Sequence, residues 1–383
     1  MGVFKPLLPV GEQPAVLRCI HIAKSAGIRE ILVVTGHMHA VIESVLRANT
    51  QDVRLVYNSR YRDGMFSSIQ AGVSELPETL DGFFLLPADC CAISPDTLTT
   101  LMEWFAENGG SLVTRPKYHG KRGHPPLIPA GYITPLLMYK GENGLKSFLS
   151  PLPTLEVEMD SPAALLDMDT PDGYAELLSY LGLPVYPDSD QCAELFSKYN
   201  TPQEIIEHGE QVAALALKIA RLMEAHEENH DSGQAISYVN KEQIKNNSSK
   251  PSFPTPYALT PNPFRSKTAL QSACLLHDIC RMTPDHARAG MELLLREGYP
   301  GAATLVGRHM DLPCFAGDIG EAELLFLADK ICRRNKLATL EDTERELEQR
   351  YAKDPTALDA AKERIKIAQS IMDALKEQYN IVP

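Results

Sequence analysis

The sequence has no long apolar run, no signal-peptide pattern and no excess of positive charge. No stretch is apolar for the roughly 20 residues that a transmembrane helix needs. The first twenty residues lack the charged-then-apolar order of a signal peptide. The net charge of -13 argues against non-specific binding to nucleic acid or an anionic membrane. These absences predict a cytoplasmic protein that binds neither nucleic acid nor membrane.

Paired cysteine motifs are missing as well. None of the eight cysteines forms a CxxC pair, and a chain of 383 residues needs no disulfides to fold. We therefore expect free thiols, mostly buried, in a reducing compartment. With 44% hydrophobic and 23% charged residues the composition is globular, and the length suggests two domains.

Strand-like and helix-like segments alternate over about the first 185 residues. Short apolar runs at 29–36, 53–58 and 81–89 are typical of buried strands, and helical patterns lie at about 14–26, 37–48, 65–76 and 95–107. This alternation predicts a parallel sheet with helices on both faces. In such a sheet the ligand lies beyond the carboxyl ends of the strands.

The second half of the sequence has a different pattern, because strand signals stop after about residue 183. We predict an α/β domain at 1–185, a linker at 186–198 and an all-α domain at 199–383. Helical patterns run from a capping box at Thr201 to about 224 and then at 267–281, 284–297, 300–309, 320–335 and 340–378. Residues 226–264, polar and rich in Asn, Ser and Pro, are predicted to form a flexible insertion.

The first candidate site consists of carboxylates and a lysine in the α/β half. Asp89 ends an apolar run, where a carboxylate can hold Mg²⁺ or simply cap a turn. Asp167 and Asp169 precede a helix that begins near Thr170, and one of them can reach the same metal or cap that helix. Lys5 can neutralise phosphate oxygens or be solvated. Two carboxylates, Mg²⁺ and a lysine suit transfer of a nucleotidyl group.

Further polar residues lie at loops of the same half. Ser67 and Ser68 stand in a turn that enters a helix, where they can contact a base or sugar or belong to an ordinary helix N-terminus. Arg122 and His124 adjoin a short strand, and they can contact a ligand, or the neighbouring prolines can simply shape an edge strand.

Six segments together make the prediction more specific. In order they are MGVFKPLLPV, VVTGH, YRDGMFSSIQAG, FLLPAD, GKRGHPPLI and LLDMDTPDGY. Over about residues 1–180 this set resembles the MobA-like nucleotidyltransferases, and in particular their molybdenum cofactor cytidylyltransferase branch. The resemblance implies a Rossmann-like fold, Mg²⁺, CTP or GTP as substrate and pyrophosphate as product.

The resemblance also assigns residues to roles. Lys5 would bind phosphate, and Asp89 and Asp169 would hold Mg²⁺, with Lys5 and Asp89 taking part in catalysis. Ser67, Ser68 and His124 would lie near the nucleotide or the pterin of a molybdopterin-type cofactor.

Two features depart from the family pattern. The family's loop usually begins with a strand and a glycine-rich turn, whereas this sequence starts at the MG that follows them. Those pieces would form the centre of the sheet and cradle the triphosphate. Either the true start lies upstream or the chain is a degraded transferase. In addition, Asp89 is followed by Cys90 and Cys91 where the family often has Asp-x-Pro, and we expect buried structural thiols there.

The second candidate site consists of histidines and aspartates in otherwise apolar helices. His277 and Asp278 are adjacent inside ACLLHDICR, and both are costly to bury without partners. His208 lies one turn into a capped helix, and Asp329 lies in FLADKICRR. Imidazoles and carboxylates from several helices suit a divalent metal ion.

The H…HD…D order of His208, His277, Asp278 and Asp329 resembles the HD domain, a superfamily of metal-dependent phosphohydrolases. The resemblance covers 199–340 apart from 226–264. It implies that these four residues hold a cation such as Mn²⁺, Fe²⁺ or Mg²⁺, with Asp278 as a catalytic residue. His286 and His309 would line the pocket, and the substrate would be a phosphorylated small molecule.

The combined prediction is a Rossmann-like nucleotidyltransferase domain followed by an all-α HD domain. The first would transfer a nucleotidyl group to a molybdopterin-type cofactor, and the second would hydrolyse a phosphate ester or anhydride. In the alternative, the first half binds or senses the cofactor or the nucleotide, and only the second half is active.

Overall fold

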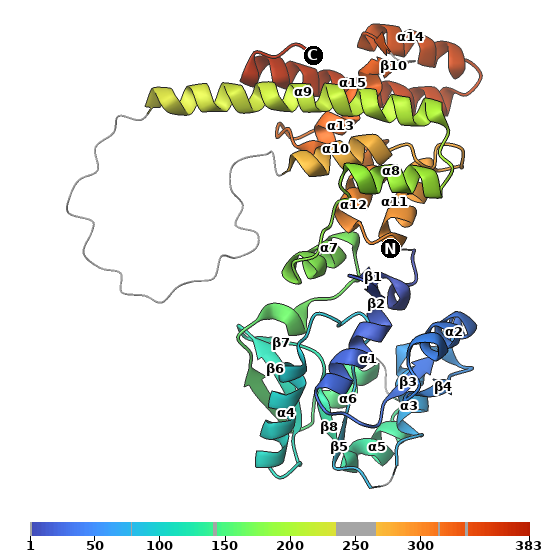
Figure 1. Cartoon of the computed structure of the whole chain (residues 1–383), viewed down its shortest axis with the longest axis vertical. Helices are drawn as coiled ribbons and strands as arrows, with labels where there is room; N and C mark the ends of the chain where they lie inside the picture. The colour runs from blue at the N-terminus through green and yellow to red at the C-terminus, as the bar shows by residue number, and fades with distance from the viewer. Residues whose placement is uncertain (1, 78, 141–143, 235–265, 313–314, 334–335) are drawn as a thin grey trace, which may run out of the picture. The chain divides into compact units, whose positions relative to one another are not determined.

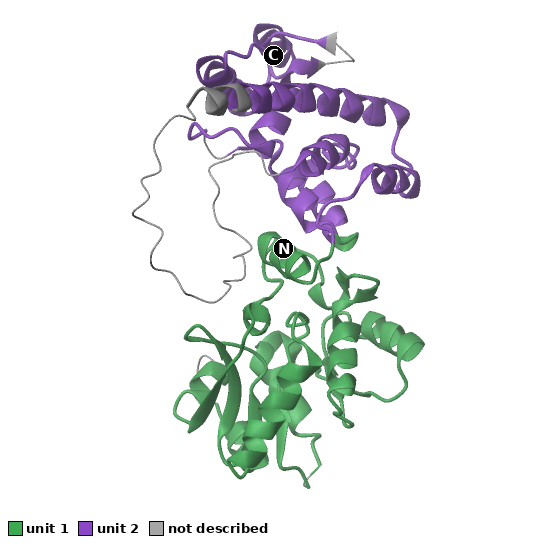
Figure 2. Ribbon diagram, turned by 60° about the vertical axis from the view of Figure 1, so that its left-hand side comes forward, with its two compact units in different colours: residues 1–183, 296–298 green, residues 184–295, 299–383 purple. Residues whose placement is uncertain are grey.

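The computed structural model describes residues 2–383 apart from 78, 141–143, 235–265, 313–314 and 334–335 (Figure 1). The chain divides into two compact units (Figure 2). Unit 1 consists of residues 1–183 and 296–298, and unit 2 consists of 184–295 and 299–383. No helix in the described part of the chain is both long enough and apolar enough to cross a membrane.

Unit 1 begins with a parallel strand pair covered by helices. Strands β3 (Leu32–Thr35) and β4 (Arg54–Tyr57) pair in parallel. Helices α1 (Ala15–Ser25) and α2 (His39–Asn49) bury an apolar cluster that includes Val33 and Leu55 of these strands. Helix α3 (Met65–Val73) follows β4. The predicted alternation of strands and helices is confirmed here, and residues 1 to about 160 form a nucleotidyltransferase-like α/β fold.

The second sheet of unit 1 is mixed, so the predicted parallel sheet is confirmed for β3 and β4 but is wrong for this sheet. The strands are β5 (Gly82–Phe84), β6 (Val113–Tyr118), β7 (Lys121–Arg122), β8 (Leu127–Pro129) and β9 (Thr154–Glu158). Only β6 and β9 pair in parallel, whereas β8 runs antiparallel to β5 and β6. Strands β6 and β7 form a hairpin because His119 and Gly120 both have positive φ, the conformation of a tight two-residue turn.

The remaining elements of unit 1 are short. They are η1 (Lys5–Leu7), the β1 (Pro9–Val10) and β2 (Gln13–Pro14) pair, η2 (Tyr61–Asp63), α4 (Pro95–Glu107), η3 (Ala130–Tyr132), α5 (Ile133–Met138), α6 (Gly144–Leu149), η4 (Pro162–Leu165) and α7 (Pro171–Tyr180). Helix α4 has the predicted bounds, because the Ser94 hydroxyl accepts a hydrogen bond from Thr97 N and Pro95 occupies the first turn.

Unit 2 is rich in helices. They are α8 (Ser189–Lys198), α9 (Gln203–Gln234), α10 (Lys267–Leu276), α11 (His286–Arg296), α12 (Pro300–Arg308), α13 (Glu321–Ile331), α14 (Leu340–Arg350) and α15 (Pro355–Tyr379). A short hairpin of β10 (Cys332–Arg333) and β11 (Lys336–Leu337) interrupts the predicted all-α pattern.

Several predicted boundaries in unit 2 need correction. The predicted linker at 186–198 contains α8, because Asp188 and Gln191 form a capping box. The long helix predicted at 340–378 is two helices, since Pro355 begins a new helix capped by Asp354. Helix α9 continues to Gln234, so the start of the predicted insertion is helical. The rest of that segment, 235–264, lies outside the described residues.

The core of unit 2 is mostly apolar, and its buried histidines and one buried aspartate lie together. Helices α9, α10, α13 and α15 bury residues such as Leu270, Phe326 and Ile371. Into the same interior the chain places His277, Asp278 and His309, each at most 1% exposed. Because buried polar groups are costly unless they are compensated, this cluster is the natural place to look for a functional site.

Candidate functional sites

In unit 1 the predicted lysine and two of the predicted carboxylates lie together. Lys5 donates a hydrogen bond to Asp169 Oδ1, and its Nζ lies 3.7 Å from Asp89 Oδ2. Burial lowers the pKa of Lys5, but the bond to Asp169 and the charges of Asp169 and Asp89 outweigh it, so the pKa is raised. Asp167 shapes the loop, since its Oδ1 accepts a hydrogen bond from Asp169 N at 2.9 Å.

This cluster is open to solvent. The side chains of Lys5 and Asp89 are 29% and 24% exposed, and that of Asp169 is 68% exposed. Asp89 follows β5 and the loop that extends it, whereas Asp169 lies just before α7. Two oxygen-bearing side chains on separate loops fit Mg²⁺, which usually takes one or two protein carboxylates and keeps several waters.

The two serines of α3 lie in a different environment. Asn58 Nδ2 donates to Ser67 Oγ at 2.9 Å and to Ser68 Oγ at 3.0 Å. Ser67 is buried, and its hydroxyl lies within donating distance of the carbonyl oxygens of Arg60 and Gly64. These bonds give Ser67 a structural task that the sequence did not indicate.

His124 and Arg122, the other two polar residues predicted near the ligand, have different surroundings. The buried Nδ1 of His124 has no hydrogen-bond partner. Burial lowers the pKa of His124, as does the nearby Arg115, so the ring is neutral at pH 7. Its neutral ring therefore remains available to a ligand. Arg122, in contrast, is exposed on β7 and pairs with Glu156.

The cysteines beside Asp89 are buried thiols, as expected. Cys90 and Cys91 are 5% and 0% exposed. Burial raises the pKa of Cys91 to about 11 and that of Cys90 further, and the charge of Asp89 acts in the same direction. Thiols with raised pKa values are poor nucleophiles and weak metal ligands at neutral pH. None of the cysteines that the structure describes forms a disulfide bond.

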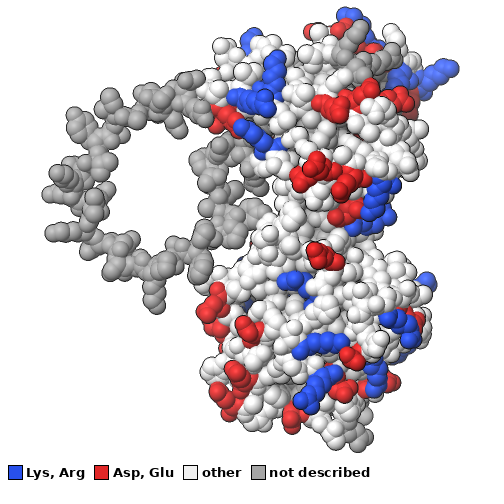
Figure 3. All heavy atoms as spheres, viewed as in Figure 1, with Lys and Arg blue, Asp and Glu red and all other residues white. Residues whose placement is uncertain are grey.

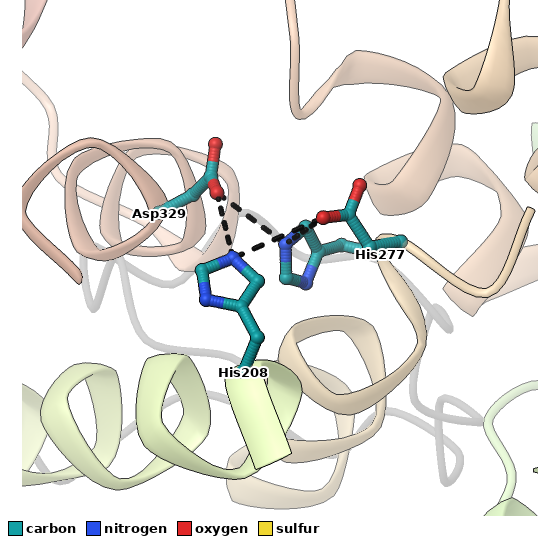
Figure 4. A group of neighbouring side chains, drawn as sticks. His208, His277 and Asp329 are labelled. Carbon is teal, nitrogen blue, oxygen red and sulfur yellow. Dashed lines mark hydrogen bonds and ion pairs between the residues drawn. The ribbon is translucent and has the colours of Figure 1, made fainter. Parts of the chain in front are cut away.

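In unit 2 the four side chains of the predicted metal site converge. His208 comes from α9, His277 and Asp278 from the C-terminal end of α10, and Asp329 from α13. One ligand atom of each lies within 4.8 Å of the other three. Figure 4 shows His208, His277 and Asp329 pointing toward one another. Asp329 Oδ1 lies 3.3 Å from His208 Nε2 and 3.4 Å from His277 Nε2.

Asp278 also belongs to a second group, with His286 and His309. Its Oδ2 lies 3.8 Å from His208 Nε2 and 3.5 Å from His277 Nε2. Its Oδ1 lies 3.2 Å from His286 Nε2 and 3.8 Å from His309 Nε2. One carboxylate therefore faces both groups, one oxygen to each.

Backbone contacts set the ring orientation of two of these histidines. His277 Nδ1 lies 2.8 Å from Cys274 O, and His309 Nδ1 lies 2.6 Å from Val306 O. Since a carbonyl only accepts, each Nδ1 carries the proton and a neutral ring keeps a lone pair on Nε2. Both Nε2 atoms are buried without a hydrogen-bond partner. Lone pairs held in this way suit a transition metal ion.

Charges compensate the two carboxylates. Burial raises the pKa of Asp278, but His286, His277 and Arg281 outweigh it, so the carboxyl pKa is lowered. The pKa of Asp329 is also lowered despite burial, chiefly by Lys330 and then by His208 and His277. Burial and the neighbouring His277 lower the pKa of His309 to about 4, so His309 is neutral at pH 7.

The sequence did not single out Arg281 and Lys330. Arg281 Nη1 pairs with Asp278 Oδ2, and Lys330 Nζ pairs with Asp329 Oδ2. Spacing gave a signal for Arg281 alone, because it stands three residues after Asp278 and side chains three apart can meet. Lys330 follows Asp329 directly, and adjacent helix positions do not ordinarily face each other.

The comparisons with known proteins concern the α/β fold of unit 1. Residues 1–157 match the family model of the MobA-like NTP transferase domain. The N-terminal region of the chain therefore matches the MobA-like NTP transferase domain, in agreement with that part of the sequence-based resemblance. The match covers no residue of the helix-rich second unit.

The chain is also similar to individual known proteins. The molybdenum cofactor cytidylyltransferase of Escherichia coli (strain K12) is 24% identical over 174 residues, which are 45% of this chain and 86% of that protein. Among solved structures, Rv0371c from Mycobacterium tuberculosis H37Rv has a TM-score of 0.40 at 21% identity, covering 47% of this chain and 91% of its own. A nucleotidyl transferase from Methanothermobacter has a TM-score of 0.41 at 25% identity, covering 47% and 86%.

Proposed function

We propose that unit 1 transfers a nucleotidyl group from CTP, or GTP, to a molybdopterin-type cofactor and that unit 2 is a metal-dependent phosphohydrolase of the HD type. In the transfer, a phosphate oxygen of the cofactor would bond to the α-phosphorus of the nucleotide. The bond from that phosphorus to the β-phosphate would break, and pyrophosphate would leave. The name of the Escherichia coli relative favours CTP and the molybdenum cofactor.

The cluster of Lys5, Asp89 and Asp169 is the observation that supports transfer in unit 1. Asp89 and Asp169 would hold Mg²⁺, which neutralises charge on transferring phosphates. Lys5, which pairs with both carboxylates, would then be free to bind a phosphate oxygen. His124, neutral and with an unpaired Nδ1, would contact the nucleotide or the pterin.

Ser67 and Ser68, which we also expected near the ligand, have different hydrogen-bond partners. Ser68, which only receives a bond from Asn58, would contact the nucleotide, whereas the bonds of Ser67 favour a supporting task. Figure 3 shows acidic and basic side chains interspersed on the displayed face of unit 1, in keeping with a small-molecule substrate.

The transfer can be tested with the full chain, radiolabelled CTP or GTP, molybdopterin and Mg²⁺. We expect a labelled dinucleotide cofactor and pyrophosphate, and a loss of about 10²-fold or more in Asp89→Asn. Asp52→Asn, an exposed acid of the same unit, is the matched control and should keep full activity. Cofactor binding without any pyrophosphate release would instead favour a binding or sensing function for unit 1.

For unit 2 the convergence of His208, His277, Asp278 and Asp329 carries the proposal. These residues would hold one divalent cation such as Mn²⁺, Fe²⁺ or Mg²⁺, and Asp278, His286 and His309 could hold another. Such a cation polarises a phosphoryl oxygen and activates water for attack on phosphorus. Arg281, which is half-exposed, can neutralise further charge on a phosphate.

Hydrolysis can be tested by incubating the full chain with pyrophosphate, nucleotides and phosphate monoesters in the presence of Mn²⁺ or Mg²⁺. We expect phosphate or nucleotide release that disappears in His277→Ala and with a chelator. Asp89→Asn should leave it unchanged, because Asp89 belongs to the other unit. If none of these compounds is hydrolysed with either metal ion, the hydrolase proposal is wrong.

A further inference from the structure

Lys330 is buried beside the cation site that we propose for unit 2. It is 6% exposed, and it is the only buried lysine among the residues that the structure describes. Its Nζ lies 2.6 Å from Asp329 Oδ2 and 4.7 Å from the centre of the Phe326 ring, one helical turn back along α13. An ammonium group loses its hydration on burial, and here a carboxylate and a ring face take the place of water.

The two oxygens of Asp329 consequently have different partners. Oδ1 faces His208 Nε2 and His277 Nε2, at 3.3 and 3.4 Å, whereas Oδ2 pairs with Lys330. Because Lys330 holds Oδ2, it is Oδ1 that is turned toward the histidines. The ammonium group has no lone pair and cannot itself bind a metal ion, so it only occupies Oδ2.

The backbone of Lys330 is held as well. The hydroxyl of Thr343, itself 1% exposed, donates to Lys330 O at 3.1 Å. An apolar side chain of similar length would fill this space at a lower desolvation cost, because ion pairs in protein interiors often contribute little net stability. The position of the ammonium is therefore better explained by its effect on Asp329 than by packing.

We propose that Lys330 is a positioning residue that makes Asp329 bind the cation through Oδ1 alone. This inference rests on the proposed hydrolase function. By holding Oδ2, Lys330 would leave open the coordination position that a two-oxygen aspartate would occupy, and a phosphate oxygen of the substrate could take it. Lys330 would act only through Asp329 and would not touch the substrate.

The test compares Mn²⁺ binding by the full chain with that of three variants. Lys330→Met removes the ammonium and keeps the length of the side chain. We expect Mn²⁺ binding to become tighter by about 10-fold or more, because the variant removes a positive charge beside the cation and frees Oδ2 of Asp329 to bind it. Lys330→Arg keeps a charged donor and should bind within a few-fold of the natural chain. Lys267→Met, at an exposed lysine paired with Glu224, is the matched control and should bind unchanged.

A spectroscopic measurement separates positioning from a merely structural effect. With Co²⁺ in the site, a switch of Asp329 from one oxygen to two raises the coordination number, so the visible absorption of Lys330→Met should fall and that of Lys330→Arg should not. Equal Mn²⁺ affinity and an unchanged Co²⁺ spectrum in a folded Lys330→Met would overturn the inference while leaving the hydrolase proposal in place.

A structure of the natural chain with Mn²⁺ tests the same point without any variant, should Lys330→Met not fold. It should place Oδ1 of Asp329 on the metal and Oδ2 on Lys330 Nζ. A metal ion held by both oxygens, with Lys330 turned away, would also overturn the inference. If the natural chain binds no divalent cation at this site, the inference and the hydrolase proposal both fail.

Discussion

Asp278→Ala is the most informative single change, because Asp278 is the one residue that belongs to both groups of possible metal ligands. Its two oxygens lie between 3.2 and 3.8 Å from four histidine Nε2 atoms. Removing the carboxylate takes away an anionic ligand from each group at once. We therefore expect the variant to lose both the hydrolase activity and the stabilisation that a bound cation gives to unit 2.

The size of that stabilisation follows from linkage. A cation present at 100 times its dissociation constant stabilises the folded state by about 2.7 kcal/mol. In a unit of 150–250 residues, 1 kcal/mol raises Tm by about 2–4 °C. Unit 2 has this size, so saturating Mn²⁺ should raise its Tm by about 5–10 °C in the natural chain. In Asp278→Ala the rise should be under about 1 °C.

The assay is thermal unfolding of the full chain with and without Mn²⁺, followed by circular dichroism. Glu363→Ala is the control, since Glu363 is 65% exposed on α15 of the same unit and pairs with Lys366. It should show the full Mn²⁺ effect. Retention of more than half of the effect in Asp278→Ala would refute the argument that both groups depend on this carboxylate.

Three further predictions concern independence of the units, thiol reactivity and helix capping. Asp89→Asn should abolish nucleotidyl transfer and leave hydrolysis intact, and Asp278→Ala should do the reverse; loss of both activities in either variant, measured in the two assays above, would contradict this. Because burial raises the pKa of Cys91 to about 11, its thiolate fraction at pH 8 is only about 10⁻³, and reactivity should rise with pH. Mass spectrometry after iodoacetamide treatment at pH 8 should find Cys91 unmodified in the native chain and modified in denaturant. Asp188→Ala removes the capping box of α8 and should cost about 1 kcal/mol, which calorimetry would detect as a Tm lower by about 2–4 °C; an unchanged Tm would mean that α8 does not depend on its cap.

Local signals gave the most accurate structural predictions. Helix α4 has the predicted bounds because Ser94 and Pro95 mark its start within a few residues of sequence. The parallel direction of strand pairing was predicted correctly for β3 and β4 but not for β8, because pairing in the second sheet depends on distant segments. Nothing near β6 in the sequence indicates that β8 lies antiparallel to it and β9 parallel.

In the candidate sites, too, the sequence predicted features that depend on residue type, but not contacts that form only when the chain folds. The order of His208, His277, Asp278 and Asp329 sufficed to predict that these side chains meet, since polar residues inside apolar helices need partners. The task of Ser67 could not be predicted, because its partners Asn58 and Arg60 become neighbours only when the chain turns before α3. Lys330 escaped notice because a lysine in a helix is ordinarily solvated.

Charge balance explains why the histidine cluster suits a phosphate substrate. Without a cation, Asp278 and Asp329 are matched by Arg281 and Lys330, so the buried site is close to neutral when its histidines are neutral. That balance makes burial of two carboxylates tolerable. Adding a divalent cation then leaves a surplus of about two positive charges in a largely water-excluded place, where electrostatic interactions are stronger than in water. A phosphate group with two negative charges restores neutrality, whereas an uncharged substrate would not.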